Sequence, residues 1–334
     1  MPFRRQKRVL EFVQLARVSR LEADRRAFWL SIQGRDERPL YRSQTLSLIA
    51  AAPFADATML QATCRELVKE HPCTVFLVLL SRAEHPLRAQ WGARVLESEH
   101  SQTVLAEELV MHVGAQDRVL LPSLIRPLLS GDVPSVTFWS AELPRDPSVV
   151  DALGSMTDEL VFDSSLLEHP ADDARRICRN LHETRDLTWQ RLAPWRRAMA
   201  EAFEHLRWSG RSKSRARIQH VGSAGSHAAA TTLSHWLTTR LGTEVRIDER
   251  PRCLAPSFEP CMLEFSSDDG SIEIAHEWPE PRLRISVSTL PEPFHSVAPS
   301  RSRGALLSEA IEDLSTNGHS GATRPPAGQL PLAP

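Results

Sequence analysis

The chain has 334 residues, of which 41% are hydrophobic and 25% are charged, and its net charge is −2. This composition indicates a globular protein long enough for two domains, and the nearly balanced charge gives no general attraction to DNA or to anionic membranes. No apolar run approaches the roughly 20 residues of a membrane-spanning helix, and the basic N-terminus lacks the apolar segment and cleavage site of a signal peptide. We therefore expect a cytoplasmic protein that binds neither membrane nor nucleic acid.

Residues 1–41 are predicted to form a basic helical leader. The first 45 residues carry eleven Lys and Arg against five Asp and Glu. Apolar residues recur among the arginines between positions 8 and 30, which favours a helix. A solvated amphipathic arm explains this segment better than a DNA contact, because no recognisable nucleic-acid-reading module follows it.

Residues 42–208 are predicted to form an α/β domain. The run CTVFLVLL at 73–80 is continuously apolar, as in a strand buried on both faces. The helix expected at 57–70 ends at His71-Pro72, because a proline disfavours helical geometry in the residue before it. The other expected strands are 45–52, 91–98, 107–113, 134–140 and 159–165, and the other expected helices are 117–131, 146–156, 170–184 and 194–206.

The polar and basic segment at 209–215 is predicted to be a linker, and residues 216–315 are predicted to form a smaller α+β domain. Residues 316–334 are rich in Pro, Gly and Ser and are predicted to be disordered. The expected strands of the smaller domain are 217–221, 244–249, 260–266, 271–278 and 282–288, and its expected helices are 228–241 and 304–315. The predicted fold class is thus α/β: a mixed sheet flanked by helices, with a second, smaller α+β domain.

Common signatures of catalysis are missing from the sequence. It contains no GxGxxG, P-loop, GxSxG or HExxH motif. The adjacent carboxylates Glu107-Glu108 and Asp172-Asp173 point to different sides of their elements, so we expect them to be solvated. The five cysteines lack ligand spacing, which argues against a zinc site and a disulfide framework. We therefore expect no catalytic residues, metal or cofactor.

The best candidate for a small-ligand site is VGSAGSH at 221–227, where a strand runs into a Gly/Ser turn and then a helix. Free N–H groups at a helix start can hold a phosphate, so Gly222, Ser223, Gly225 and Ser226 are possible phosphate-binding residues. The alternative is that a serine caps the helix and the glycines serve the turn.

The segment RDLTWQRLAPWRRAM at 185–199 places two tryptophans six positions apart among arginines. Arginine can stack on indole while keeping donors for a carboxylate, and both residue types are enriched at interface hot spots. Equally, Trp189 and Trp195 can be core anchors beside ordinary surface arginines. Stacking of single-stranded bases is disfavoured by the nearby Glu183 and Asp186.

The run Asp186-Leu187-x-Trp189-x-Arg191-Leu192-x-Pro194-Trp195-Arg196 resembles the hallmark of the OpcA family, the glucose-6-phosphate dehydrogenase assembly proteins. Three further stretches resemble that family in the same order: Glu70-His71-Pro72-Cys73, Val133-Pro134-x-Val136-x-Phe138-Trp139 after Leu120-Leu121-Pro122, and residues 159–165. Two positions depart from the pattern. Ala193 stands where the family usually has Thr, and Phe138-Trp139 stands where two tryptophans are common.

The resemblance implies a protein that is not an enzyme. Such proteins associate with glucose-6-phosphate dehydrogenase and promote its active oligomer or raise its affinity for substrate. The residues implied in partner binding or in the motif are Asp186, Trp189, Arg191, Leu192, Pro194, Trp195, Arg196, Phe138 and Trp139. Two alternatives stay open from the residues: a sugar-phosphate or nucleotide sensor or enzyme that uses the 222–226 turn, and a nucleic-acid binder led by the arginine-rich leader.

Overall fold

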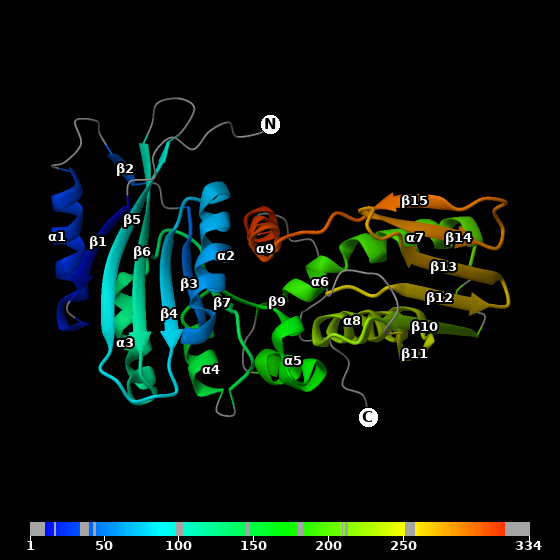
Figure 1. Cartoon of the computed structure of the whole chain (residues 1–334), viewed down its shortest axis with the longest axis horizontal. Coiled ribbons are helices and arrows are strands. Elements are labelled where there is room, and N and C mark those ends of the chain that lie inside the picture. Colours follow the sequence, from blue (N-terminus) through cyan, green and yellow to red (C-terminus); the bar gives the residue numbers. More distant parts are fainter. Residues whose placement is uncertain are drawn as a thin grey trace. The chain divides into compact units, whose positions relative to one another are not determined.

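The structure is a computed structural model, and the chain divides into two units (Figure 1). The first unit comprises Met1–Phe162 with Asn180–Thr184, and the second comprises Asp163–Arg179 with Arg185–Pro334. The residues that the structure describes are 11–16, 18–33, 40–42, 45–97, 103–144, 147–179, 183–208, 210, 213–250 and 258–317.

The first unit is built on a nine-stranded sheet with the order β1-β5-β6-β4-β3-β7-β8-β9, and β2 pairs with β6. Its centre is parallel, because β3 pairs in parallel with β4 and β7, β4 with β6, and β7 with β8. The strands are β1 (Glu11–Ala16), β2 (Leu40–Arg42), β3 (Ser47–Pro53), β4 (Thr74–Leu80), β5 (Arg88–Glu97), β6 (Thr103–Val113), β7 (Ser135–Trp139), β8 (Glu159–Phe162) and β9 (Thr184–Asp186). Every residue of β4 is buried, as the continuous apolar run predicts.

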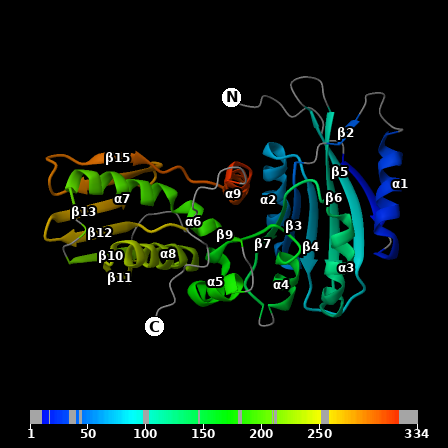
Figure 2. The ribbon, with the colours of Figure 1, turned by 180° about the vertical axis from the view of Figure 1, so that it is seen from behind.

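Helices cover both faces of this sheet. Figures 1 and 2 show α2 (Ala57–Glu70) on one face and α3 (Leu121–Ile125) on the other. The remaining helices of the unit are α1 (Leu21–Gln33) and α4 (Ser148–Gly154), and short 3-10 turns flank α3 at Ala115–Leu120 and Arg126–Leu128. The single helix expected at 117–131 is therefore broken into three short turns, consistent with the two prolines within it.

The described parts of the predicted leader belong to the first unit rather than to a separate arm. Strand β1 pairs antiparallel with β5, and β2 pairs with β6, so the helix expected across 8–30 is wrong for residues 11–16. Arg25 of α1 donates to Glu107 from both Nε (2.9 Å) and Nη2 (2.7 Å), and Trp29 Nε1 donates to the same carboxylate at 2.7 Å. Glu107 is only 2% exposed, which corrects the prediction that it is solvated.

The second unit contains a six-stranded sheet with the order β11-β10-β12-β13-β14-β15, in which only the β10–β11 pair is parallel among the described strands. Helix α7 packs on β13 and β14, and α8 packs on β10 and β11. The strands are β10 (Ser214–His220), β11 (Glu244–Glu249), β12 (Met262–Ser267), β13 (Gly270–His276), β14 (Arg282–Val287) and β15 (Phe294–Val297), and the helices are α5 (Pro170–Arg179), α6 (Leu187–Arg191), α7 (Ala193–Leu206), α8 (Ala224–Leu241) and α9 (Arg303–Asn317). The predicted α/β class with helices on mixed sheets is confirmed, but the second unit is not the smaller one, since the two units are equal in length.

The division between the units differs from the predicted boundary at 209–215. Helix α7 was expected to close the first domain, but its buried residues pack in one cluster with those of the second sheet. Ser214 already belongs to β10, and residues 209, 211 and 212 lie outside the described part. Helix α9 extends to Asn317, and the rest of the predicted tail, 318–334, also lies outside it.

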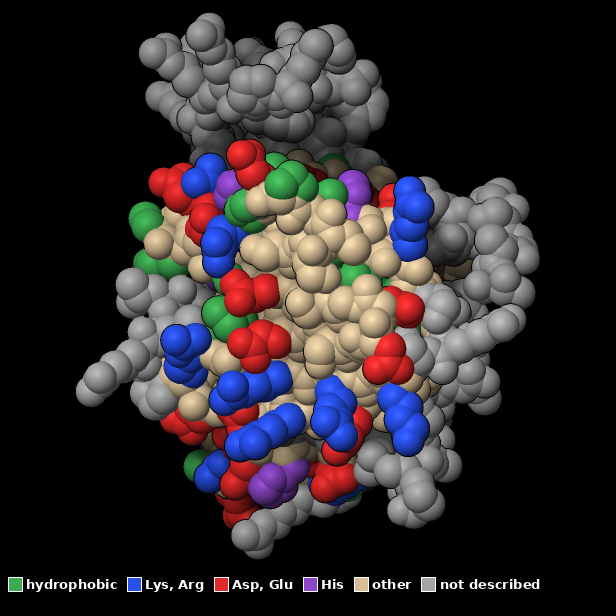
Figure 3. Space-filling view, turned by 90° about the vertical axis from the view of Figure 1, so that its right-hand side faces the viewer, with side chains coloured by type: hydrophobic (Ala, Val, Ile, Leu, Met, Phe, Trp, Pro, Cys, Tyr) green, Lys and Arg blue, Asp and Glu red, His purple; other side chains and the backbone are tan. Residues whose placement is uncertain are grey.

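Strand residues of the second sheet that point away from α7 and α8 are largely polar and form ion pairs across strands. Arg217 Nε lies 2.5 Å from Asp248, and Arg284 Nη2 lies 3.0 Å from Glu273. Figure 3 looks onto the end of this unit that lies at the right of Figure 1, and there acidic and basic side chains are mixed around uncharged surface, with hydrophobic side chains only in small areas. This surface is therefore typical of a solvent-facing one.

Candidate functional site

The motif begins with Asp186, which caps α6. Its Oδ1 accepts hydrogen bonds from the backbone N–H of Thr188 (2.9 Å) and of Ser164 (3.0 Å). Burial raises the pKa of the Asp186 carboxyl to about 6, although both hydrogen bonds favour the charged form. Asp186 thus ties the start of α6 to the short 3-10 turn at Ser164–Leu166.

Arg191, at the end of α6, enters a buried ion-pair cluster around Asp163. The Asp163 carboxylate, 1% exposed, accepts from Arg191 Nη2 at 3.2 Å and from Arg303 Nε at 3.1 Å. Hydroxyl groups of Ser165 and Thr188 donate to its other oxygen. Burial alone would raise the pKa of Asp163, but the two guanidinium groups outweigh burial and hold this pKa below its ordinary value.

Trp195 lies in the core of the second unit. Its side chain is fully buried, and its Nε1 donates to Glu259 Oε2 at 3.3 Å. Burial raises the pKa of Glu259, while the hydrogen bond from Trp195 opposes that rise. Leu192 and Pro194 are buried beside Trp195 in the sequence. These three motif residues therefore hold α7 in place and offer no surface to a partner.

Trp189 and Arg196 lie on the outer side of the motif. The Arg196 guanidinium stacks over the Trp189 ring at 3.7 Å from its centroid, and its Nη2 donates to the Trp189 carbonyl at 3.4 Å. The Trp236 ring of α8 lies 6.3 Å from the Trp189 ring. Arg301 donates to the Gln190 carbonyl at 2.7 Å and pairs with Glu309. We call Trp189, Arg196, Trp236 and Arg301 the outer motif surface.

The electrostatic state of Arg196 is unusual within this surface. Burial, together with the positive charge of Arg301, lowers the pKa of Arg196 to about 10. No described carboxylate neutralises this guanidinium, whereas Asp163 forms an ion pair with Arg191. Part of the motif is thus a closed ionic core, and part is a cationic and aromatic surface.

Phe138 and Trp139 do not lie on a surface. Both belong to β7 of the first unit and are 0% and 2% exposed. The Trp139 Nε1 donates to the Glu142 carbonyl at 3.3 Å. Their expected role in partner binding is therefore replaced by a role in the core of the first sheet.

The phosphate candidate at 222–226 forms the cap of α8. Ser223 Oγ accepts from the Ser226 N–H at 3.2 Å, and the Gly222 N–H donates to His220 Nδ1 at 3.1 Å. Gly222 has φ +87°, a left-handed conformation that favours glycine, and the side chain of Glu249 lies beside it. The alternative of a serine cap and a glycine turn accounts for these residues, and the Glu249 carboxylate opposes an anion there.

The first sheet contains a point at which its strand order reverses, between β3 and β7, where open α/β sheets commonly bind ligands. The turn after β3 reads Pro53-Phe54-Ala55-Asp56, with Phe54 exposed and its ring 5.3 Å from that of His112. A dinucleotide pyrophosphate needs glycines for close backbone approach and free amides at the helix start. All four residues of this turn carry side chains, and one of these is a carboxylate, so the turn does not fit a dinucleotide pyrophosphate.

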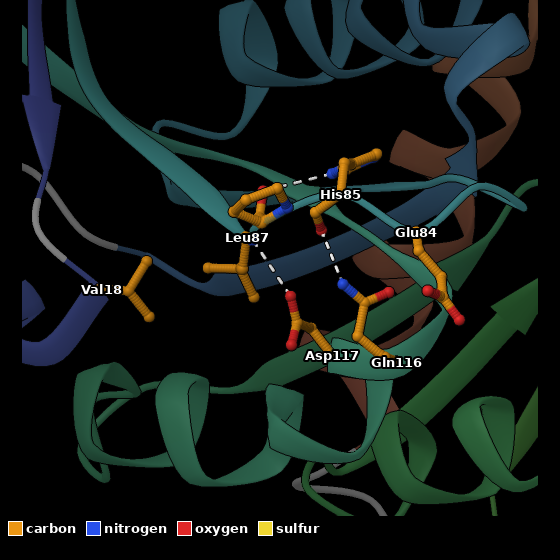
Figure 4. A pocket seen from close by; sticks show the side chains of 7 residues that line it. Val18, Glu84, His85, Leu87, Gln116 and Asp117 are labelled. Atoms are coloured by element: carbon orange, nitrogen blue, oxygen red, sulfur yellow. Dashed lines mark hydrogen bonds between the residues drawn. The ribbon is translucent and has the colours of Figure 1, made fainter.

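A depression of about 470 Å³ lies at the loop between β4 and β5 (Figure 4). Two of its side chains bond to the loop backbone: Asp117 accepts from the Leu87 N–H at 3.0 Å, and Gln116 Nε2 donates to the His85 carbonyl at 3.0 Å. Its lining residues are Val18, Glu84, His85, Pro86, Leu87, Gln116 and Asp117. These hydrogen bonds hold the loop, and no sequence motif had indicated the depression.

The candidate metal ligands of the described residues do not cluster. Within these ranges, no group of three or more His, Cys, Asp and Glu side chains could hold a metal ion. Cys64, Cys73 and Cys261 are buried, and burial raises the pKa of Cys73 to about 12. The side chain of Cys178 and all of Cys253 lie outside the described part. Across the same described ranges, every helix is too short or too polar to span a bilayer.

Sequence reasoning missed Asp163, Arg301 and Arg303 as partners of the motif. Asp163 and Arg303 are 140 positions apart, so no local pattern links them. The available signals were weak: Asp163 directly follows a buried strand, and the two arginines lie just before and at the start of the closing helix.

The sequence matches the glucose-6-phosphate dehydrogenase subunit N-terminal domain over residues 64–179 and the C-terminal domain of the same subunit over residues 182–318. Two curated relatives, whose names include the words OxPP cycle protein OpcA, come from a Synechocystis species and from Nostoc punctiforme. They are 24% identical over 181 and 185 residues, which is 52% and 53% of this chain but only 38% and 39% of theirs. The chain thus matches well under half the length of these relatives.

Among solved structures, the chain is similar to a levoglucosan dehydrogenase in complex with NADH and L-sorbose, with TM-score 0.47, 11% identity and coverage of 86% of this chain and 94% of that one. It is also similar to biliverdin reductase from Synechocystis, with TM-score 0.45, 10% identity and coverage of 84% and 94%. Likeness at this level carries no information about activity. The two family matches jointly cover most of the sequence and include the whole motif, and they show that the chain belongs to the OpcA family of glucose-6-phosphate dehydrogenase assembly proteins.

Proposed function

We propose that the chain is a non-catalytic assembly factor that binds glucose-6-phosphate dehydrogenase and favours its active oligomer. The observation that carries the proposal is the family match. The two matched domains extend over parts of both units and include the complete motif. The relatives' names place those proteins in the OxPP cycle, and this agrees with a partner that acts on glucose 6-phosphate.

The structure of the motif supports a binding role. Its inner residues, Arg191 and Trp195, are committed to Asp163 and Glu259 and so fix α6 and α7 rigidly. Its outer residues, Trp189 and Arg196, are only partly buried. A rigid scaffold that presents aromatic and arginine side chains is typical of a protein-binding surface.

The non-catalytic part of the proposal rests on how candidate sites are occupied. The turn at the strand-order reversal carries Phe54 and Asp56 where a dinucleotide site needs glycine, and the 222–226 turn is used by the α8 cap. At the depression, Asp117 and Gln116 bond to the backbone of the loop at Leu87 and His85. Each feature has a structural role that needs no substrate.

The physical mechanism is a shift of population. A protein that binds the active oligomer more tightly than the inactive form moves the equilibrium by the difference in binding free energy, typically about 1–3 kcal/mol. This corresponds to a change of about 5- to 150-fold in the ratio of the two forms.

The test is steady-state kinetics of the cognate dehydrogenase with and without the purified chain, under oxidised and reduced conditions. We expect a lower KM for glucose 6-phosphate or a higher kcat, saturating with added chain, and no turnover by the chain alone. Unchanged kinetic constants, together with an unchanged size-exclusion profile of the mixture, would exclude the assembly role.

A further inference from the structure

We propose that the outer motif surface binds a carboxylate that the partner presents on an exposed Asp or Glu, with Arg196 as its direct contact. This inference rests on the proposed function, because the partner is taken to be glucose-6-phosphate dehydrogenase. It goes further by naming the chemistry of the contact and the side chain that makes it.

The first observation is that Arg196 meets no carboxylate among the described residues. Its Nε is buried without a hydrogen-bond partner, and its Nη2 makes only the 3.4 Å bond to the Trp189 carbonyl. By contrast, Arg191 and Arg303 both pair with Asp163, and Arg301 pairs with Glu309. Among these four neighbouring arginines, Arg196 alone lacks an anionic partner.

The second observation is that the guanidinium is held in one orientation. Stacking at 3.7 Å on Trp189 fixes its plane, and the Trp236 ring supports Trp189 at 6.3 Å. A guanidinium held flat on an indole keeps donors at its edge for the two oxygens of a carboxylate. Because the orientation is set before binding, less entropy is lost when the carboxylate arrives.

The third observation is the second positive charge. Arg301 lies close enough to lower the pKa of Arg196, and its own position is fixed by Glu309 and by the Gln190 carbonyl. An incoming carboxylate relieves the repulsion between the two arginines. The indoles beside it exclude water, which strengthens the resulting ion pair.

A protein carboxylate fits this surface better than a nucleic-acid backbone does. The turns of α7 that follow Arg196 carry Glu201 and Glu204, whose charges oppose a chain of phosphates that runs along the helix. A single carboxylate needs only the guanidinium and its aromatic support. The structure therefore favours one acidic side chain over an extended anion.

The experiment measures binding of the full chain to the cognate dehydrogenase by isothermal titration calorimetry at two salt concentrations. Arg196→Glu is expected to weaken binding by at least about 30-fold, the loss typical of a charge pair broken within an interface. Arg196→Lys keeps the charge but loses the planar fork, and we expect about a 10-fold loss. Arg197→Glu is the matched control: it makes the same charge change at the next, exposed position, and we expect less than a threefold effect.

Each outcome decides a separate point. No binding by the wild-type chain would contradict the proposed function itself. Wild-type binding that Arg196→Glu leaves unchanged, or that Arg197→Glu weakens equally, would overturn this inference and leave the function standing. Displacement of the partner by a single-stranded oligonucleotide would also overturn it. Recovery of Arg196→Glu binding by one Asp or Glu→Arg change in the partner would establish the pair, and unchanged thermal melting of the variants would show that folding is intact.

Discussion

Arg303 Nε lies 3.1 Å from Asp163 Oδ2, although the two residues are 140 positions apart in the chain. The same carboxylate also accepts from Arg191 of the motif, so the first turn of α9 and the end of α6 share one anion. Asp163 is thus the point through which the closing helix contributes to the position of the motif.

Asp163→Asn is expected to destabilise the protein by about 3–5 kcal/mol, because it leaves two buried guanidinium groups without their counter-charge. Equilibrium urea unfolding of both proteins measures this difference. Asp248→Asn is the matched control, since it breaks ion pairs with the exposed Arg217 and Arg246, and we expect little change from it. Equal effects of the two variants would contradict the buried cluster.

Asp186→Asn is expected to change how stability depends on pH. The folded pKa of Asp186, about 6, lies above its unfolded value near 4, so ionisation in the folded state costs stability above pH 6. This cost disappears as the pH falls from about 6 to about 4. The Asn amide oxygen keeps both hydrogen bonds but does not ionise, so the variant should gain about 1–2 kcal/mol over wild type at pH 7.5.

The measurement is urea unfolding of wild type and Asp186→Asn at intervals between pH 4 and 8. The difference between the two proteins isolates Asp186 from other titrating groups. A difference that does not vary with pH would show that this carboxyl group is not perturbed. The effect of Asp163 on stability has the opposite pH dependence. Because its pKa is lowered in the folded state, its ionisation stabilises the fold above about pH 4, and this stabilisation is lost as the pH falls below that value.

Trp195→Ala is expected to cost about 3–5 kcal/mol, because it empties a fully buried site and leaves Glu259 without its indole donor. Loss of dehydrogenase activation in this variant would therefore reflect loss of folding. Thermal melting followed by circular dichroism checks this, with Trp278→Ala as control, since Trp278 is 50% exposed. A native melting curve for Trp195→Ala would contradict its place in the core.

The 222–226 turn is expected to bind neither inorganic phosphate nor glucose 6-phosphate. Ser223 uses its side chain to cap α8, so Ser223→Ala should cost about 0.5–2 kcal/mol of stability whether or not these anions are present. Calorimetric titration with each anion checks the first point, and unfolding checks the second. Saturable heat that Ser223→Ala removes would restore the sensor alternative.

The sequence predicted elements best where a local signal fixed their ends. Helix α2 ends at Glu70, and β4 starts at Thr74, as the intervening His71-Pro72 indicates. Strand β11 lies at the predicted residues 244–249. In contrast, residues 11–16 form a strand because β5 offers them a pairing edge, and no local pattern reveals a partner more than seventy positions away.

The residues of the candidate site could be identified from the sequence, but the directions in which their side chains point could not. The motif was found from its residues, but the six-residue spacing of Trp189 and Trp195 did not show that they lie on different helices, α6 and α7. From the sequence, each tryptophan can therefore belong to an interface or to the core. In the structure the two tryptophans differ. Trp195 is buried in the core against Glu259, and Trp189 is partly exposed beneath Arg196.

The claim that the chain assembles with the cognate glucose-6-phosphate dehydrogenase can be tested by analytical ultracentrifugation of the enzyme, alone and mixed with the full chain at several ratios. We predict a new, faster-sedimenting species that contains both proteins and grows at the expense of smaller dehydrogenase forms until the chain saturates it. Independent sedimentation of the two proteins at every ratio, in oxidising and in reducing buffer, would contradict the claim.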